Sequence, residues 1–249
     1  MKKTISIVSI ILAAMLFFGC ETLEQVSNKL NDFSNNMNQK SEETSSQKNQ
    51  DTDKWDLAKL DTARNVDYLS NIEKDVVLEM NKARTNPALY AELYIEPRTK
   101  KFNEKIYNGR LRTNEGVAVV NECVSYMKGL KATSILNPEK GLSLAAQRHS
   151  STQGETDQTG HTGVDGSDPF TRIKKYGTYR TAGENIDYGA KTGQDIVVDL
   201  LIDDGVSSRG HRKNILNKDF SSTGAGFTPK HKLYGSVCVI TYAGGYTEK

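Results

Sequence analysis

The chain has 249 residues, of which 36% are hydrophobic and 26% charged, with 20 Gly, 5 Pro and 3 Cys. These proportions exclude a chain that is disordered throughout, a collagen-like repeat and a small disulfide-dense domain. The 33 basic residues nearly balance the 31 acidic ones. The sequence also lacks a run of basic residues that could bind a phosphate backbone. Nucleic acid is therefore not an expected partner.

The N-terminus has the pattern of an export signal. Two lysines precede an apolar run over residues 5–18, which is shorter than the ~20 residues needed to span a bilayer. The run ends in LFFGC at residues 16–20, which resembles the bacterial lipobox, with Phe18 where a small residue is usual. The resemblance implies a lipoprotein signal peptide over 1–19 and acylation of Cys20. The protein would then be lipid-anchored to a cell membrane, periplasmic or at the cell surface; an ordinary signal peptide or an uncleaved anchor is the alternative.

A polar segment follows. About half of residues 21–54 are Asn, Gln, Ser or Thr, a composition that cannot offset an ordering entropy of ~1–2 kcal/mol per residue. We expect a flexible tether over 20–65 and one domain over 66–249. A short helix on the membrane or against another chain is the alternative, because apolar residues recur at helical spacing at Leu23, Val26, Leu30, Phe33 and Met37.

Apolar periodicity then predicts the order of the elements. The polar, basic residues 98–114 predict a surface loop, and 160–168 have turn chemistry. Alternation predicts late strands over 224–227 and 234–242. Helices before strands indicate an α+β fold rather than alternating βαβ units. The helices are expected at 72–80, 88–94, 117–127, 138–153, 169–176 and 195–204.

Three short stretches carry the chemistry. His161 lies in a glycine-flanked turn, and Glu184 lies between a glycine and apolar residues in AGENI. Asp203 and Asp204 follow the apolar stripe of the last helix, eight and seven residues before His211. Burying an unpaired carboxylate costs several kcal/mol, so we expect a histidine or a cation beside any acid that turns inward.

These stretches together resemble the CAP superfamily of cysteine-rich secretory, antigen 5 and pathogenesis-related proteins, also called SCP domains. The blocks are GHTGVDGSDPF, AGENI, DDGVSSRGHRKNIL and the late VCVITYAGGY, within residues 67–246. The resemblance implies a three-layer α-β-α sandwich and a cleft with two histidines and two acids. Carried over, the cleft residues are His161, Glu184, one of Asp203 and Asp204 with Asp203 preferred, and His211.

Such a set would suit Zn²⁺ or another divalent cation. A hydrogen-bonded His–Glu pair without a metal is the alternative. His149 could approach the cleft from its wall, although packing in a helix or a surface position is the simpler expectation, and His231 is expected to be solvated. Cys123 and Cys238 could form a disulfide in an oxidising compartment or remain two buried thiols.

The resemblance leaves several functions open. We expect a binding module without turnover, whose ligand is a cation, a small apolar molecule or another protein. The alternatives are a peptidase-like, metal-dependent hydrolase acting on envelope or host material, and a structural envelope protein. The sequence has no HExxH helix and no GxSxG elbow around Ser207. A Ser–His–Glu arrangement using Ser150 or Ser207 is a minor alternative.

Overall fold

The computed structural model describes residues 54–249. The predicted signal peptide, the acylation of Cys20 and the 23–37 apolar face lie outside these residues. Residues 56–249 form one compact unit. Helix α3 (Leu57–Leu60) belongs to it, and Leu60 and Ala63 are buried. The packed unit thus begins ten residues before the boundary that composition predicts, because a few apolar side chains inside a polar stretch anchor it.

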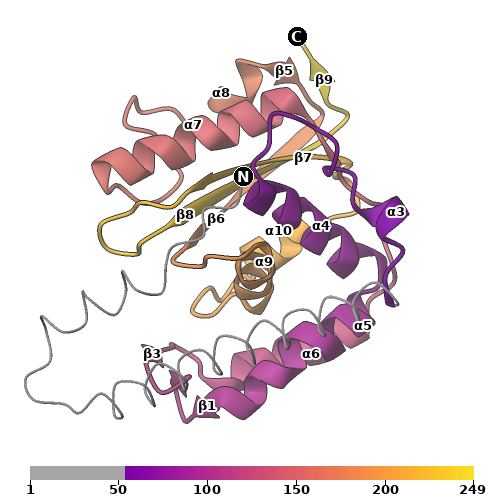
Figure 1. Ribbon diagram of the computed structural model, residues 1–249, viewed down its shortest axis with the longest axis vertical. Helices are drawn as coiled ribbons and strands as arrows, with labels where there is room; N and C mark the ends of the chain where they lie inside the picture. Colours follow the sequence, from indigo (N-terminus) through magenta and orange to yellow (C-terminus); the bar gives the residue numbers. More distant parts are fainter. Residues whose placement is uncertain (1–53) are drawn as a thin grey trace, which may run out of the picture. The chain divides into compact units, whose positions relative to one another are not determined.

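A four-stranded sheet forms the middle of the unit (Figure 1). Its strands are β4 (Asn137–Pro138), β7 (Ser222–Thr228), β8 (Val237–Gly244) and β6 (Thr181–Tyr188), in that spatial order. β7 and β6 each pair antiparallel with β8, whereas β4 pairs parallel with β7. Every residue of β8 is buried, so both faces of the sheet must be covered.

Helices cover the two faces (Figure 1). On one face lie α7 (Lys140–Thr156) and α8 (Pro169–Lys174), which pack Leu142 and Ile173 against Ala243 of β8. α7 comes close to the β7 backbone because Gly224 and Gly226 face it. A Cβ on Gly224 would lie 2.2 Å from the Ser143 nitrogen.

The opposite face is covered by α4 (Asn71–Thr85), α9 (Gly193–Ile202) and α10 (Gly210–Ile215). Glu73 accepts the Ser70 N–H at 2.7 Å at the start of α4, and the Asn86-Pro87 step ends that helix. Beyond these helices lie α5 (Pro87–Tyr90), the helical turns η1 (Ala91–Ile95) and η2 (Glu96–Lys101), and α6 (Val117–Lys128).

Two regions differ from expectation. The predicted loop over 98–114 contains the end of η2 and a small antiparallel sheet of β1 (Phe102–Asn103), β2 (Ile106–Tyr107) and β3 (Leu111–Arg112). Its second turn is Asn108-Gly109, both at positive φ, which is a hairpin signal. β6 was not predicted as a strand. A further two-stranded sheet joins β5 (Gly177–Thr178) to β9 (Thr247–Glu248).

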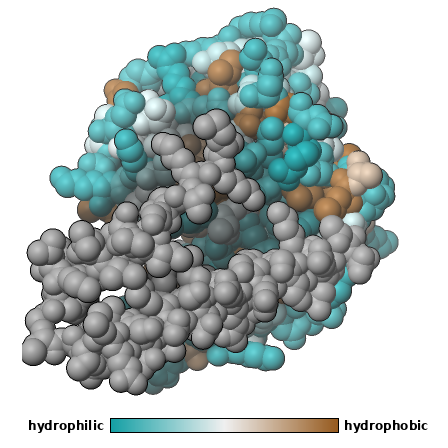
Figure 2. Space-filling view, viewed as in Figure 1, coloured by the Kyte–Doolittle hydropathy of each residue, from teal (hydrophilic) through white to brown (hydrophobic). Residues whose placement is uncertain are grey.

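None of the helices in the described part of the chain combines the length and apolar character needed to cross a bilayer. On the face seen in Figure 2, hydrophilic residues cover most of the coloured surface, and hydrophobic ones form small separate patches.

Candidate functional site

Strand β6 organises the candidate site. It is an edge strand that pairs only with β8 in the described sheet. Ala182 and Ile186 pack on the α7 side, so Glu184 between them faces that side by strand alternation. Asn185 faces the other side, where its amide donates to the Tyr242 hydroxyl at 3.2 Å and to the backbone carbonyl of His211 at 3.0 Å.

The first pair joins His161 to Glu184. The ring Nδ1 lies 2.9 Å from Glu184 Oε1, and the side chains are 51% and 1% exposed respectively. Arg172 of α8 donates to both carboxylate oxygens, at 3.0 and 2.8 Å, and is itself buried. Its other terminal nitrogen donates to the carbonyls of His161 and Ser167. One guanidinium therefore neutralises the buried acid and fixes the turn that carries the histidine.

Arg172 was missed by sequence reasoning. A buried acid needs a partner, and this expectation applies to Glu184 as well. The signal in the sequence was the presence of basic residues in the short helix that follows the histidine turn. A helix of six residues is too short for its apolar periodicity to indicate which side chain turns inward.

The second pair joins His211 to Asp203. Asp203 is the C-cap of α9 in a left-handed conformation, with φ 60°. Its Oδ1 lies 2.6 Å from His211 Nδ1, and its Oδ2 accepts the backbone N–H of His211 at 2.9 Å. The carboxylate is 0% exposed and the ring 26%. Asp203 thus holds both the ring and the start of α10.

Asp204 points elsewhere. Its carboxylate accepts the backbone N–H groups of Asn114 and Glu115, each at 2.8 Å. In turn, Glu115 pairs with Arg209 at 2.7 Å, and hydrogen bonding from that guanidinium lowers the pKa of Glu115 to about 2. Of the two aspartates, the structure places Asp203 against the histidine and uses Asp204 to tie the 203–209 loop to the segment before α6.

The structure does not assemble the expected cation site from four side chains. The first pair lies on the α7–α8 side of β6, and α10 brings the second from the other side. Within residues 54–249, no group of three or more His, Cys, Asp or Glu side chains is close enough to hold a metal ion. Both carboxylates already accept hydrogen bonds from Arg172, from the imidazoles or from backbone N–H groups. The donor set is two His–carboxylate pairs, which does not fit a four-ligand centre.

The other two histidines are both buried. His149 lies on α7 behind the His161 turn, with Nε2 2.9 Å from the Gln153 amide nitrogen, and burial lowers its pKa. The expectation that His231 is solvated is wrong. Its ring packs against Tyr188 and Tyr234, with centroids at 5.6 and 5.1 Å, because the aromatic rings cover the turn that carries it.

Cys123 and Cys238 are free thiols, both fully buried. The Cys123 Sγ donates to the Leu201 carbonyl at 3.2 Å. Burial raises the pKa of Cys123 to about 12 and that of Cys238 well above its ordinary value. Of the two alternatives, the structure has separate thiols, which at these pKa values are neutral and unreactive.

The hydrogen-bond partners of the two site imidazoles bear on whether the site has a nucleophile. Among the described residues, no serine, threonine or cysteine side chain hydrogen-bonds to the ring of His161 or His211. Ser150 instead donates to the Gln147 carbonyl and accepts from Thr228. The Ser–His–Glu arrangement considered from the sequence is therefore not formed by Ser150 or Ser207.

Comparison with known proteins decides the family. The family model described as "CAP: Cysteine-rich secretory protein family" matches residues 79–242. The chain belongs to the CAP family. The match runs from within α4 to within β8, including both His–carboxylate pairs. It confirms the α+β CAP fold expected from the sequence blocks.

The similarity of this chain to individual proteins covers only part of their length. "Uncharacterized protein YkwD" of Bacillus subtilis is 33% identical over 108 residues, which are 43% of this chain and 39% of the relative. An outer surface protein of Borrelia burgdorferi is 19% identical, with a TM-score of 0.39 over 45% of this chain and 80% of its own. An extracellular SCP-domain protein of Bacillus anthracis is 19% identical, with a TM-score of 0.37 over 51% and 38%.

Proposed function

We propose that this protein is an extracytoplasmic CAP-domain lipoprotein that binds a ligand without chemical turnover. Acylated Cys20 would anchor it to a cell membrane, and the polar segment after it would hold the domain away from the lipid. The sequence support is the basic start, the 5–18 apolar run and the LFFGC ending.

The observation that carries the binding role is the way both site imidazoles are held. Each ring is oriented through Nδ1 by a buried carboxylate, while the rings themselves are 51% and 26% exposed. An oriented, accessible imidazole is suited to hydrogen-bonding a ligand, because little rotational freedom is lost on binding. Because no serine, threonine or cysteine side chain within residues 54–249 hydrogen-bonds to either ring, the arrangement offers recognition without a covalent step.

The anchor is tested by Cys20→Ala in the native host. The wild-type protein should incorporate labelled fatty acid and fractionate with membranes, whereas the variant should do neither. A variant at Cys123, which is buried far along the chain, is the control for general effects of removing a thiol. A wild-type protein that incorporates no labelled fatty acid would reject the lipid anchor.

A hydrolase is the second candidate, and the His211–Asp203 pair favours it. A buried carboxylate at 2.6 Å from Nδ1 fixes which ring nitrogen carries the proton. The other nitrogen could then accept a proton from water, as in general-base catalysis. This version uses a water molecule rather than a cation. A metal-dependent hydrolase needs three protein ligands and an open position for water, and no three His, Cys, Asp or Glu side chains within residues 54–249 are close enough to hold a metal ion.

One assay distinguishes the binding function from the hydrolase function. The wild-type protein is incubated with a mixed peptide library and with peptidoglycan fragments, and products are followed by mass spectrometry. We expect no product from wild type or from His211→Ala. Turnover that disappears in His211→Ala and survives in His161→Ala would replace the binding role with the hydrolase.

A further inference from the structure

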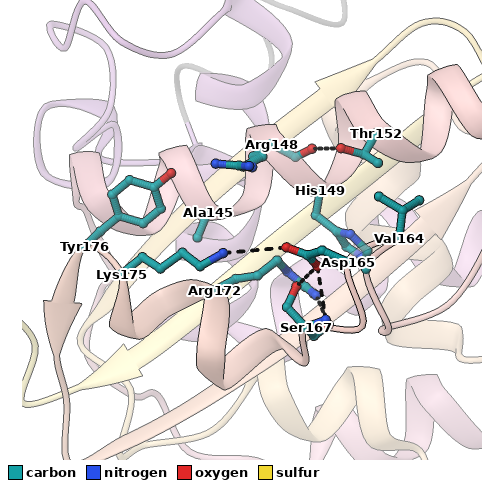
Figure 3. Close-up of a pocket in the computed structure, with 11 residues that line it drawn as sticks. Ala145, Arg148, His149, Thr152, Val164, Asp165, Ser167, Arg172, Lys175 and Tyr176 are labelled. Carbon is teal, nitrogen blue, oxygen red and sulfur yellow. Dashed lines mark hydrogen bonds and ion pairs between the residues drawn. The ribbon is translucent and has the colours of Figure 1, made fainter.

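A small hollow lies next to the first pair, between α7, α8 and the turn over 163–167 (Figure 3). Its volume is about 100 Å³. An apolar cavity of about 150 Å³ holds benzene, so this space suits a polar group with a short apolar stem. The residues that line it include Ala145, Arg148 and His149 of α7, together with Val164 and Lys175.

A hydrogen-bond network lies behind the hollow. The Tyr188 hydroxyl accepts the Gly160 N–H at 2.7 Å and donates to Gln153 Oε1 at 2.8 Å. The Gln153 amide nitrogen therefore donates to the Gly160 carbonyl at 2.6 Å and lies 2.9 Å from His149 Nε2. His149 Nε2 also lies 3.0 Å from the Gly160 carbonyl, so this network holds the His149 ring in place at the wall of the hollow.

One buried donor beside the hollow lacks an acceptor. The Nε of Arg172, which lines the hollow, is buried without a hydrogen-bond partner in the described part of the chain. Buried donors are nearly always satisfied in folded proteins, so an unsatisfied donor beside a hollow indicates a missing acceptor.

The charges around the hollow favour an anion. Arg148 makes no ion pair or side-chain hydrogen bond within residues 54–249, and the ends of Arg148, Lys175 and Tyr176 gather at one side of the hollow in Figure 3. Asp165 is the acidic residue among those lining it, with Oδ2 3.6 Å from Lys175 Nζ and Oδ1 accepting from Ser167. The positive charge of Arg172 is matched by Glu184. The balance is one net positive charge, which suits a monoanion better than a dianion.

We propose that this hollow binds the carboxylate group of a small organic acid or chain end. The carboxylate oxygens would accept from Arg172 Nε and interact with Arg148 and Lys175, while the attached carbons lie against Ala145 and Val164. The proposal goes beyond the binding role argued above, since it uses neither His161 nor His211 and shares only Arg172 with the first pair.

The ligand class is tested by titrating the full-length protein with sodium propionate and following the histidine ring signals by NMR. Because His149 lines the hollow, propionate should shift its ring signal saturably. The Kd should be on the order of 1 mM, since so small a ligand has few contacts. Propionamide, the neutral isostere, and phosphate at equal ionic strength should not shift it. An absent shift, or an equal shift with either control, would overturn the proposal.

Charge variants place the ligand within the hollow. Arg148→Gln and Lys175→Gln should each weaken propionate binding about fivefold, as expected for a partly exposed ion pair. Asp165→Asn should tighten it by a similar factor, because a competing carboxylate is removed. The matched controls Arg110→Gln and Lys140→Gln, exposed cations outside the hollow, should change nothing. Weaker binding by Asp165→Asn, or an effect of the controls equal to that of Arg148→Gln, would contradict the assignment.

The source of the carboxylate is distinguished by comparing hexanoate with N-acetylglycine. Tighter binding of hexanoate indicates a fatty acid, and tighter binding of N-acetylglycine indicates a peptide C-terminus. If both lose all affinity relative to propionate, the hollow does not accept a chain end, and that part of the proposal fails.

Discussion

Both His–carboxylate pairs have the same kind of contact, a carboxylate oxygen against a histidine Nδ1. The groups that hold each carboxylate in place differ between the two pairs. Glu184 sits on a rigid strand, meets a histidine 23 residues away in sequence and is neutralised by the buried Arg172. Asp203 sits at a helix end, meets a histidine eight residues away and is satisfied by N–H groups. The first pair therefore depends on tertiary packing and a buried charge pair, whereas the second is built locally by one loop.

The largest effect is expected at the cation of the first pair. Arg172→Met leaves Glu184 buried without its partner, which should lower the free energy of unfolding by about 3–5 kcal/mol. Chemical denaturation measures it, with Arg148→Gln as the control at an exposed arginine. The double variant Arg172→Met/Glu184→Gln should recover part of the loss. A single variant as stable as the control would mean that Arg172 does not support the pair.

Another buried carboxylate, Asp187, makes no ion pair with a cation among residues 54–249. One oxygen lacks a partner, and burial raises the pKa of Asp187 to about 8. Because the folded pKa lies above the unfolded one, the stabilising contribution is fully present below pH ~4 and is lost as pH rises through 8. The unfolding free energy should fall with a slope of up to about 1.4 kcal/mol per pH unit in this window.

Asp187→Asn isolates that contribution. Subtracting its pH profile from that of wild type should leave a difference that grows from pH 4 to pH 8. A difference that is flat across this range would show that Asp187 ionises normally in the folded state.

A smaller effect is expected at the second pair. Asp203→Asn removes one acceptor from the group that holds the His211 ring and the α10 N–H groups, which should cost about 1–3 kcal/mol. Hydrogen exchange should increase over 204–215 and stay unchanged over 160–168. Asp204→Asn is the neighbouring control and should leave the His211 ring signals as in wild type. Faster exchange around His161 as well would mean that the two pairs are coupled.

The smallest effect is expected from chelation. If no cation bridges the two pairs, EDTA should change the Tm by less than about 1 °C, because removing a ligand matters only when one is bound to the folded state. Thermal scans with and without EDTA, and with added Zn²⁺, make the comparison. If the Tm falls by several degrees on chelation and Zn²⁺ reverses the fall, the folded protein binds a cation, and the interpretation as two metal-free pairs is wrong.

Sequence reasoning reached much of the fold, and its failures have particular causes. The α4, α6, α7 and α9 helices were predicted because each has one apolar face over ten or more residues. β6 was missed because its residues, TAGENIDY, mix charged, polar and small side chains while most of the strand is buried. Its buried polar groups are satisfied by partners distant in sequence, which no local pattern indicates.

The sequence by itself determined the family, the α+β order of elements and the identity of the two histidines and their acids, because those depend on local periodicity and on short blocks of residues. Only the tertiary structure decided that the four side chains form two pairs, that Asp203 rather than Asp204 meets His211, and that Arg172 sits on Glu184. The reason is physical: a buried charge takes as its partner whichever group the packing of distant segments brings within hydrogen-bonding distance, and sequence spacing does not encode that distance.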